Sequence, residues 1–338
     1  MSWPWPRVPH GADLARARSL YGEPALGWMD LSTGIHPRGW PAEACRVSEA
    51  AWRELPAPPR QVLDAFERYY GAGAWPVAGS QAVIQALPRV WRRLRGAAVV
   101  EVLAPSYGEH AARWSLEGHA VRLTAAQHLG RERADVMVMA LPNNPTGERC
   151  SSIRLHQLAA ACEWLVVDAA FADADDGDHG MRMPANAIVL RSLGKFFGLA
   201  GLRVGAVLAP EPWRAALIAE LGPWAVSGPG LEVAAAALSD ARWQHDARQW
   251  LAAQSRALGE RLSRHGLAHQ GTALFRTARL PQARALHEGL ARAGIWTRLF
   301  ELRDPEPYEA VRFGLPADER ALQRLDLALG KVLEEMSK

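Results

Sequence analysis

The sequence is short of cysteine, and its three cysteines form no recognisable pair. Cys45, Cys150 and Cys162 are the only ones among 338 residues, and none belongs to a C-x-x-C motif. An odd count without that spacing argues against structural disulfides and against a zinc site. We therefore expect no metal, and a reducing cytoplasm as the compartment.

Long apolar runs and clusters of positive charge are also absent. No stretch approaches the roughly 18 uninterrupted apolar residues that a membrane helix needs, and the opening Met-Ser-Trp-Pro-Trp-Pro lacks the apolar core of a signal peptide. Lys and Arg together number 39 against 36 for Asp and Glu, and no long basic run occurs. We expect neither a membrane nor a nucleic acid as partner.

What the sequence does contain is typical of a folded globular chain, with 49% hydrophobic and 22% charged residues. Continuous apolar segments predict strands at 97–103, 136–141, 165–167, 187–190 and 204–208. Helical patterns lie between them, at 107–118 and 153–163, and before them, at 61–70 and from residue 80. Continuous apolar strands joined by helices indicate an α/β fold, a three-layer doubly wound and mainly parallel sheet.

The length of the chain suggests a second, smaller domain. Residues 211–264 have helical patterns, and a strand, helix, strand, strand, helix pattern over 273–329 indicates a compact α+β unit. We predict an N-terminal arm with part of the small domain at 1–45, a large domain at 46–240 and a small C-terminal domain at 241–338.

The strongest chemical signal lies between residues 191 and 203. Lys195 occupies a small-residue turn, with Ser192 three residues before it and Arg203 eight residues after it. A lysine that can lose its proton forms a Schiff base with a carbonyl cofactor, and a hydroxyl and a guanidinium suit a phosphate. We interpret this stretch as a pyridoxal-phosphate lysine with phosphate anchors. The alternative is an ordinary strand and turn with a surface lysine.

Polar residues at other strand ends fit the same cofactor, because ligands of open α/β sheets bind beyond the carboxyl ends of the strands. Asp168 follows an apolar strand and suits a carboxylate that keeps a pyridine nitrogen protonated. Tyr107 is placed to stack on a flat ring, and Asn144 has a donor for a ring oxygen. Gly79-Ser80-Gln81 opens a helical pattern and offers free N–H groups to an anion, although this motif alone favours plain N-capping by Ser80.

Together these motifs resemble the fold type I pyridoxal-phosphate enzymes of the aspartate-aminotransferase class, from about residue 28 to the end. The motifs are Pro142-Asn-Asn-Pro-Thr-Gly147, Val166-Val-Asp-Ala-Ala-Phe171, Ser192-Leu-Gly-Lys195 and Leu199-Ala-Gly-Leu-Arg203. The resemblance implies pyridoxal 5'-phosphate as cofactor, a homodimer, and Lys195 and Asp168 as catalytic residues. It implies a cofactor site made of Gly79, Ser80, Gln81, Tyr107, Asn144, Asp168, Ser192, Lys195 and Arg203.

Within this class the sequence is similar to threonine-phosphate decarboxylases and to histidinol-phosphate aminotransferases. The loop Asp30-Leu-Ser-Thr-Gly-Ile-His-Pro37 and the motifs Ile295-Trp-Thr-Arg298 and Val311-Arg-Phe-Gly314 resemble the decarboxylases. This resemblance implies a substrate site made of His10, Gly11, Gly34, Asn144, Arg298 and Arg312.

The implied reaction is decarboxylation of L-threonine O-3-phosphate to (R)-1-aminopropan-2-yl phosphate, the aminopropanol linker of cobalamin. A histidinol-phosphate-type aminotransferase is the alternative, and an inactive regulatory protein with the same fold is a remote one. Phe171 stands where aminotransferases commonly carry a tyrosine, and phenylalanine cannot donate a hydrogen bond. Leu55 stands where the family carries a tyrosine that reaches the partner's cofactor phosphate, so we expect fewer hydroxyls on that phosphate.

Overall fold

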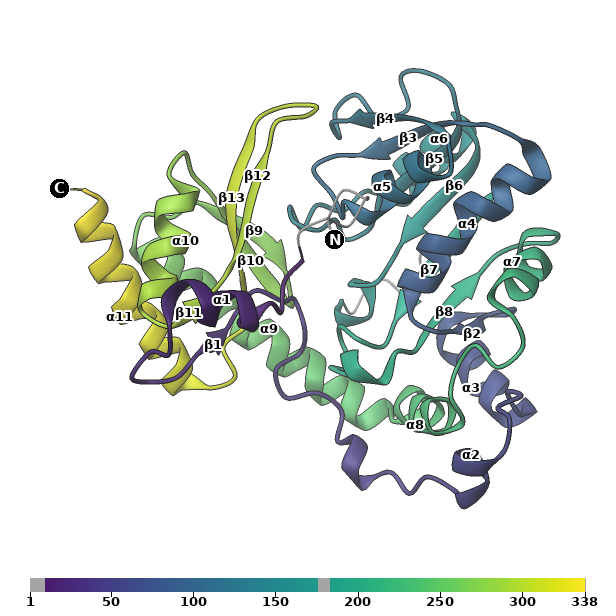
Figure 1. Ribbon diagram of the computed structural model, residues 1–338, viewed down its shortest axis with the longest axis horizontal. Helices are drawn as coiled ribbons and strands as arrows, with labels where there is room; N and C mark the ends of the chain where they lie inside the picture. The colour runs from purple at the N-terminus through teal and green to yellow at the C-terminus, as the bar shows by residue number, and fades with distance from the viewer. Residues whose placement is uncertain (1–9, 176–182, 338) are drawn as a thin grey trace.

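The computed structural model describes residues 10–175 and 183–337, which form two bodies of β structure flanked by helices (Figure 1). The opening hexapeptide, and the first nine positions of the predicted N-terminal arm, lie outside the described residues. Among the residues that the structure describes, no helix combines the length and apolar character that a membrane crossing needs.

The larger body is built on a seven-stranded sheet in the order β2-β8-β7-β6-β5-β3-β4. Its strands are β2 (Trp75–Val77), β3 (Val99–Leu103), β4 (Ala120–Thr124), β5 (Ala134–Ala140), β6 (Cys162–Asp168), β7 (Ala187–Ser192) and β8 (Gly205–Leu208). The pairs from β7 through β6, β5 and β3 to β4 are parallel. Only β8 is antiparallel, to β2 and β7. The prediction of a mainly parallel sheet is confirmed.

The central strands are apolar throughout because both faces of the sheet are covered. Val136 and Val138 pack into the core on one face of β5, whereas Met137 and Met139 pack into a separate core on the other. Side chains alternate between the faces of a strand, so two buried faces require a continuous apolar run. The helices of this body are α2 (Glu49–Arg53), α3 (Arg60–Tyr70), α4 (Ser80–Arg95), α5 (Glu109–Leu116), α6 (Ser152–Ala160), α7 (Trp213–Leu221) and α8 (Gly228–Ser239).

The smaller body has an antiparallel sheet in the order β12-β13-β10-β9. Its strands are β9 (His269–Thr272), β10 (Phe275–Arg279), β12 (Arg298–Leu302) and β13 (Tyr308–Gly314), and its helices are α10 (Ala283–Arg292) and α11 (Glu319–Met336). The start of the chain joins it: α1 (Leu14–Tyr21) lies beside it, and β1 (Met29–Asp30) pairs in parallel with β11 (Ile295–Trp296). The predicted α+β unit is present, and the predicted boundaries at residues 45 and 240 stay predictions.

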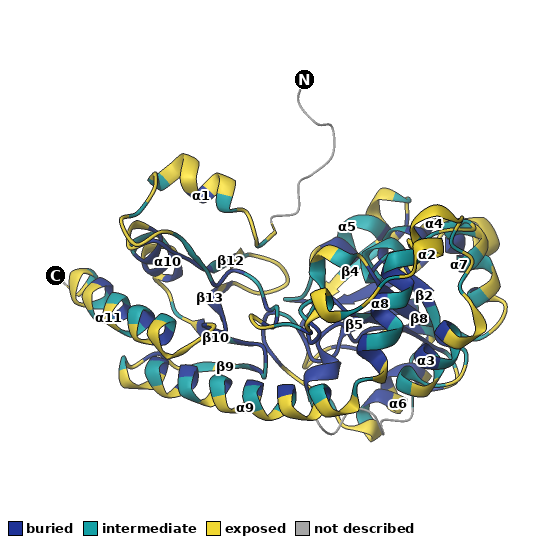
Figure 2. Cartoon of the chain, turned by 90° about the horizontal axis from the view of Figure 1, so that it is seen from below, coloured by how far each residue is buried: buried dark blue, intermediate teal, exposed yellow. Residues whose placement is uncertain are grey.

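One long helix, α9 (Ala241–Arg264), runs from the large body along the small sheet (Figures 1 and 2). Its buried residues Ala247, Leu251, Ser255, Leu258 and Leu262 recur at three-to-four-residue spacing, which places them on one face of the helix. The opposite face is exposed along most of its length (Figure 2). The buried face of this helix is therefore the apolar face that its sequence pattern indicates.

Several predicted boundaries were wrong. The helix expected to reach residue 163 ends at Ala160, and β6 begins at Cys162, because Cys162 pairs with Ala134 of the neighbouring strand. The helix expected from Tyr107 begins two residues later, at Glu109. The apolar pattern did not predict β2, β4 or β9. In β4 only Thr124 is buried, so this edge strand lacks the run of apolar residues that marks the central strands.

Candidate active site

The polar residues predicted at strand ends lie along one edge of the large sheet, where it meets the small body. Asp168 is the last residue of β6 and Ser192 the last of β7, while Asn144 follows β5. The small sheet contacts this edge directly, since the Thr277 hydroxyl donates to the Pro145 carbonyl at 2.7 Å. The site therefore draws on both bodies of the protein.

Lys195 occupies the turn after β7 and is partly buried. Its ammonium nitrogen lies 5.3 Å from the centre of the Phe171 ring, and its backbone carbonyl accepts a hydrogen bond from the His36 amide at 3.0 Å. Burial and the nearby charge of Arg312 lower the pKa of the amine to about 8, although Asp168 acts in the opposite direction. Near neutral pH this amine therefore has a much larger unprotonated fraction than an ordinary lysine, and nucleophilic chemistry at lysine requires the unprotonated form.

Asp168 is buried and held from two sides. One carboxylate oxygen accepts a hydrogen bond from the Ala170 amide at 3.1 Å, and the other lies 2.9 Å from Nε2 of His110. His110 is itself buried. A carboxylate fixed in this way has lone pairs left for a cationic ring nitrogen at the sheet edge.

Backbone N–H groups and a guanidinium meet at the start of α4. Gly79, with φ 74°, is the N-cap residue of α4, and no side chain caps the start of this helix. The alternative that Ser80 is the N-cap was therefore wrong. The Ser80 hydroxyl has no hydrogen-bond partner within the described part of the chain. The Arg203 guanidinium approaches so closely that a Cβ on Gly79 would lie 3.0 Å from its Nη2. A helix start, a hydroxyl and an arginine form a site suited to a phosphate.

Ser192, the third predicted phosphate anchor, uses its hydroxyl locally. Its Oγ accepts a hydrogen bond from the Gly194 amide at 3.2 Å, which fixes the turn that carries Lys195. The hydroxyl proton remains available to an anion.

Tyr107 lies in the turn before α5, and its hydroxyl donates to Oε1 of Gln81 at 3.1 Å. Burial raises the pKa of Tyr107, and the charges of Glu109 and Asp168 raise it further. The phenol therefore stays neutral, and its ring is nearly perpendicular to that of His110, with centroids 6.1 Å apart. This arrangement can support a flat ring lying over Tyr107.

Two arginines stand side by side on the small sheet. Arg298 in β12 and Arg312 in β13 are direct partners across the antiparallel pair. Burial lowers the pKa of Arg312 to about 9, and the like charge of Arg298 contributes. Arg312 donates to the Asn144 side-chain oxygen and, at 2.7 Å, to the Ser32 carbonyl. Two adjacent, partly desolvated guanidiniums favour a ligand with negative charge.

The predicted substrate residues of the N-terminal part lie at the rim of this site. The exposed His10 side chain is 3.1 Å from Glu109, and its ring centroid is 6.0 Å from that of Tyr107. Gly34 packs so tightly that a Cβ would lie 2.7 Å from the Phe171 ring, and Gly11 packs against the backbone of Ser32.

The structure thus places the predicted residues around one site, but their roles toward a cofactor or substrate stay predictions. Three further residues of the site were not predicted: His110, Glu109 and Ser32. The buried Ser32 accepts a hydrogen bond from the Ala12 amide, donates to Asp30 and receives Arg312 on its carbonyl. Its position in the loop 30–37 was a signal that could have found it.

Comparison with known proteins adds the family. The family model for aminotransferases of class I and II matches residues 66–302, which is more than half of the chain. The chain belongs to this aminotransferase family.

Within the aminotransferase family the chain is similar to proteins named threonine-phosphate decarboxylase. One from Pseudomonas aeruginosa is 44% identical over 331 residues, covering 95% of this chain and 96% of the relative. One from Sinorhizobium is 39% identical over 345 residues, covering 96% and 98%. Among solved structures, histidinol-phosphate aminotransferase from Sinorhizobium meliloti, in complex with pyridoxal-5'-phosphate, has a TM-score of 0.80 at 21% identity and covers 98% of this chain and 96% of its own. That likeness shows the fold, and confirms the α/β class with a smaller second unit.

Proposed function

We propose that this protein is a pyridoxal-phosphate enzyme that decarboxylates L-threonine O-3-phosphate. The observation that carries the proposal is the 44% identity to a threonine-phosphate decarboxylase over almost the full length of both chains. The site supports it, because Arg298 and Arg312 present two positive groups to a substrate with two anionic groups. The product expected is (R)-1-aminopropan-2-yl phosphate.

The residues present fit the cofactor. The Ser80 hydroxyl, the start of α4 and the Arg203 guanidinium form a cradle suited to its phosphate, and the Asp168 carboxylate, oriented by His110, suits its ring nitrogen. Lys195, with a pKa of about 8, suits its aldehyde. When bound, pyridoxal phosphate supplies an electron sink for the bond that breaks.

The other roles in the proposed reaction fall to residues of the chain itself. Asp168 holds a proton on the ring nitrogen, and Lys195 returns a proton to the carbon that loses CO2. Arg298 and Arg312 hold the phosphate and carboxylate of the substrate, and their placement decides which bond aligns with the ring. Asn144 already receives Arg312 on its side-chain oxygen, so this arginine is oriented before a substrate arrives.

The test is release of CO2 from L-threonine O-3-phosphate without any added oxo acid. We expect CO2 and one aminopropanol phosphate per substrate consumed, and none with Lys195→Ala. Absence of CO2 from the wild-type protein, with transamination of histidinol phosphate to 2-oxoglutarate instead, would establish the aminotransferase alternative.

We further propose that the protein acts as a homodimer. Trp52 on α2 and Leu55 just after it are 70% and 68% exposed, and Trp224, in the loop before α8, is 55% exposed. The two segments are neighbours, since Gly228 packs against the backbone of Ala51. Large exposed apolar side chains gathered on one surface support association with a second copy.

A further inference from the structure

Tyr107 is held between the two groups that suit the cofactor. Its hydroxyl lies 3.1 Å from the side-chain oxygen of Gln81, which follows Ser80 in the candidate phosphate cradle at the start of α4. Its ring is nearly perpendicular to that of His110, with centroids 6.1 Å apart, and Nε2 of His110 is 2.9 Å from Asp168. A flat ligand that reaches from the cradle to Asp168 therefore passes beside Tyr107.

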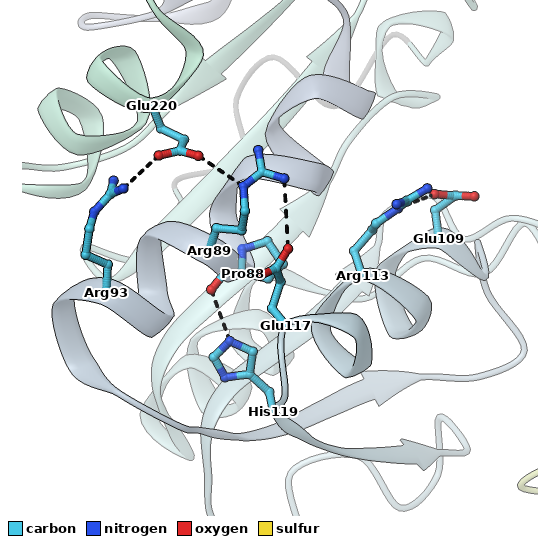
Figure 3. Close-up of polar contacts among 8 residues, drawn as sticks. All are labelled: Pro88, Arg89, Arg93, Glu109, Arg113, Glu117, His119 and Glu220. Atoms are coloured by element: carbon cyan, nitrogen blue, oxygen red, sulfur yellow. Dashed lines mark hydrogen bonds and ion pairs between the residues drawn. The ribbon is translucent and has the colours of Figure 1, made fainter. Parts of the chain in front are cut away.

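The side-chain amide of Gln81 uses both of its polar atoms within the chain. Its oxygen faces Tyr107, and its nitrogen donates to Oε2 of Glu109 at 2.9 Å. The same carboxylate oxygen accepts a hydrogen bond from Arg113 at 2.9 Å, one turn along α5 (Figure 3). The backbone N–H of Gln81 is different, because it belongs to the first turn of α4, where N–H groups have no partner within the helix.

Glu109 decides which way this amide points. Its side chain is 6% exposed. Burial acts to raise its pKa, but the hydrogen bond and charge of Arg113, with the hydrogen bond from Gln81, hold the pKa below its usual range. An ionised carboxylate only accepts hydrogen bonds, so it must face the NH2 group of the amide. The amide oxygen is then left for Tyr107, and because this oxygen can only accept, the phenol must donate.

The phenol proton of Tyr107 is therefore already engaged within the protein. Burial raises the pKa of Tyr107, and the charges of Glu109 and Asp168 raise it further, so the proton stays on the oxygen. A hydrogen bond at the far end of the side chain also restricts the tilt of the ring. What Tyr107 offers to a flat ligand is the face of its ring.

We propose that Gln81 is a positioning residue for Tyr107: its amide, oriented by Glu109, holds the phenol as a donor, so that Tyr107 meets the cofactor with its ring face alone. The phosphate of the cofactor is then contacted by the backbone of Gln81 and not by its side chain. This rests on the proposed function, since pyridoxal phosphate is taken as the occupant of the site. The rival explanation is that the Gln81 side chain itself binds the cofactor phosphate.

Two probes separate these explanations, because only one of them carries a ring. Pyridoxine 5'-phosphate has the ring and phosphate of the cofactor but no aldehyde, so it cannot react with Lys195, whereas inorganic phosphate tests the cradle alone. Calorimetry gives the Kd of each probe for the full chain freed of its cofactor, as wild type, Gln81→Ala, Tyr107→Phe and the double variant. Gln249→Ala is a matched control, because Gln249 is exposed on α9 and contacts His245.

We expect Gln81→Ala to raise the Kd of pyridoxine 5'-phosphate about two- to tenfold, the range of one hydrogen bond, and to leave the Kd of inorganic phosphate unchanged. Added to Tyr107→Phe, which already lacks the phenol, Gln81→Ala should cause no further rise. Gln249→Ala should match the wild type. With pyridoxal phosphate bound, the visible circular dichroism of the cofactor should change alike in Gln81→Ala and Tyr107→Phe, because both release the aromatic ring at position 107.

An equal rise in the Kd of both probes for Gln81→Ala would overturn the proposal, since the side chain would then bind phosphate directly. So would a rise of the same size with and without the phenol. Tyr107→Phe removes a single oxygen and provides an arm that does not depend on the folding of Gln81→Ala; it must weaken binding of pyridoxine 5'-phosphate and not of inorganic phosphate.

The proposed function can fail separately. If the two probes follow the expected pattern while no CO2 is released from L-threonine O-3-phosphate, the proposed function fails and this inference stands. If CO2 is released while Gln81→Ala and Tyr107→Phe act independently of each other, only this inference fails.

Discussion

Lys195 lies where positive charge already exceeds negative charge. The charges of Arg312 and Arg203 oppose its protonation, and only Asp168 favours it. In such surroundings the charged form of a lysine destabilises the folded state. The site therefore trades some stability for a reactive amine.

That cost leads to a prediction for the cofactor-free protein. Lys195→Met should raise the free energy of unfolding at pH 7 by about 1–3 kcal/mol, discounted for the partial exposure of the amine. The folded pKa of about 8 lies below the ordinary value of 10.5, so the unfolded chain binds more protons between these values. The penalty is complete below pH 8 and disappears as pH rises to about 10.5.

Urea unfolding of both proteins at pH 7 and pH 10 measures this difference. The advantage of Lys195→Met should shrink at the higher pH, and an advantage independent of pH would show that lost packing, not charge, dominates. Lys195 is one of only three lysines in the sequence, so few other amines titrate in this range.

The site residues that could be predicted from the sequence were those that belong to local motifs. Lys195 and Asp168 stand in recognisable motifs at strand ends, and Arg312 stands in a recognisable motif within β13. His110 and Glu109 were missed because their partners in the site, Asp168 and His10, are 58 and 99 positions away in the chain. A partner at that separation leaves no local pattern. His36, in the loop 30–37, stacks on Trp250 with centroids 5.2 Å apart, which the loop sequence alone does not indicate.

At the scale of elements, α4 is tied to α7 by a carboxylate between two arginines. Glu220 accepts hydrogen bonds from Arg89 at 3.0 Å and Arg93 at 2.9 Å (Figure 3). Hydrogen bonds from both arginines lower the pKa of Glu220. The contact matters for function because α4 begins at Ser80 in the candidate phosphate cradle.

Glu220→Gln should lower the free energy of unfolding by about 0.5–1 kcal/mol at neutral pH and low salt, because such partly exposed pairs contribute little. The contribution is present above the ordinary carboxyl pKa and is lost as pH falls through the lowered folded value. Thermal unfolding at low and high salt checks it, with Glu117→Gln as control, since Glu117 is 3.9 Å from Arg89. A loss unaffected by salt would contradict an electrostatic origin.

Helices and strands with a clear hydrophobic pattern were predictable from the sequence, whereas strands that form only because they pair with a neighbouring strand were not. The stripe of α9 and the apolar runs of β5 and β7 follow from local sequence. By contrast β2 has three residues, one of them Pro76, and exists because it pairs with β8. The same reason places the start of β6 inside a segment with a helical pattern.

At the scale of the whole molecule, the proposed dimer gives a further prediction. Trp52→Ser should shift the protein toward the monomer, because it removes the most exposed tryptophan of the described chain from the proposed surface. Sedimentation equilibrium over a range of concentrations measures the shift. Ile153→Ser is a matched control, since Ile153 is 73% exposed on α6, and an equal effect of both changes would remove the support for this surface.

The two bodies of the protein divide the site between them. Arg298 and Arg312 are partners within one sheet, whereas Lys195 and Asp168 belong to the other. A change in the angle between the sheets therefore alters the separation of both guanidiniums from the amine together, and leaves their distance from each other unchanged. The angle between the two sheets is therefore a single geometric variable that sets the distance of both guanidiniums from the Lys195 amine.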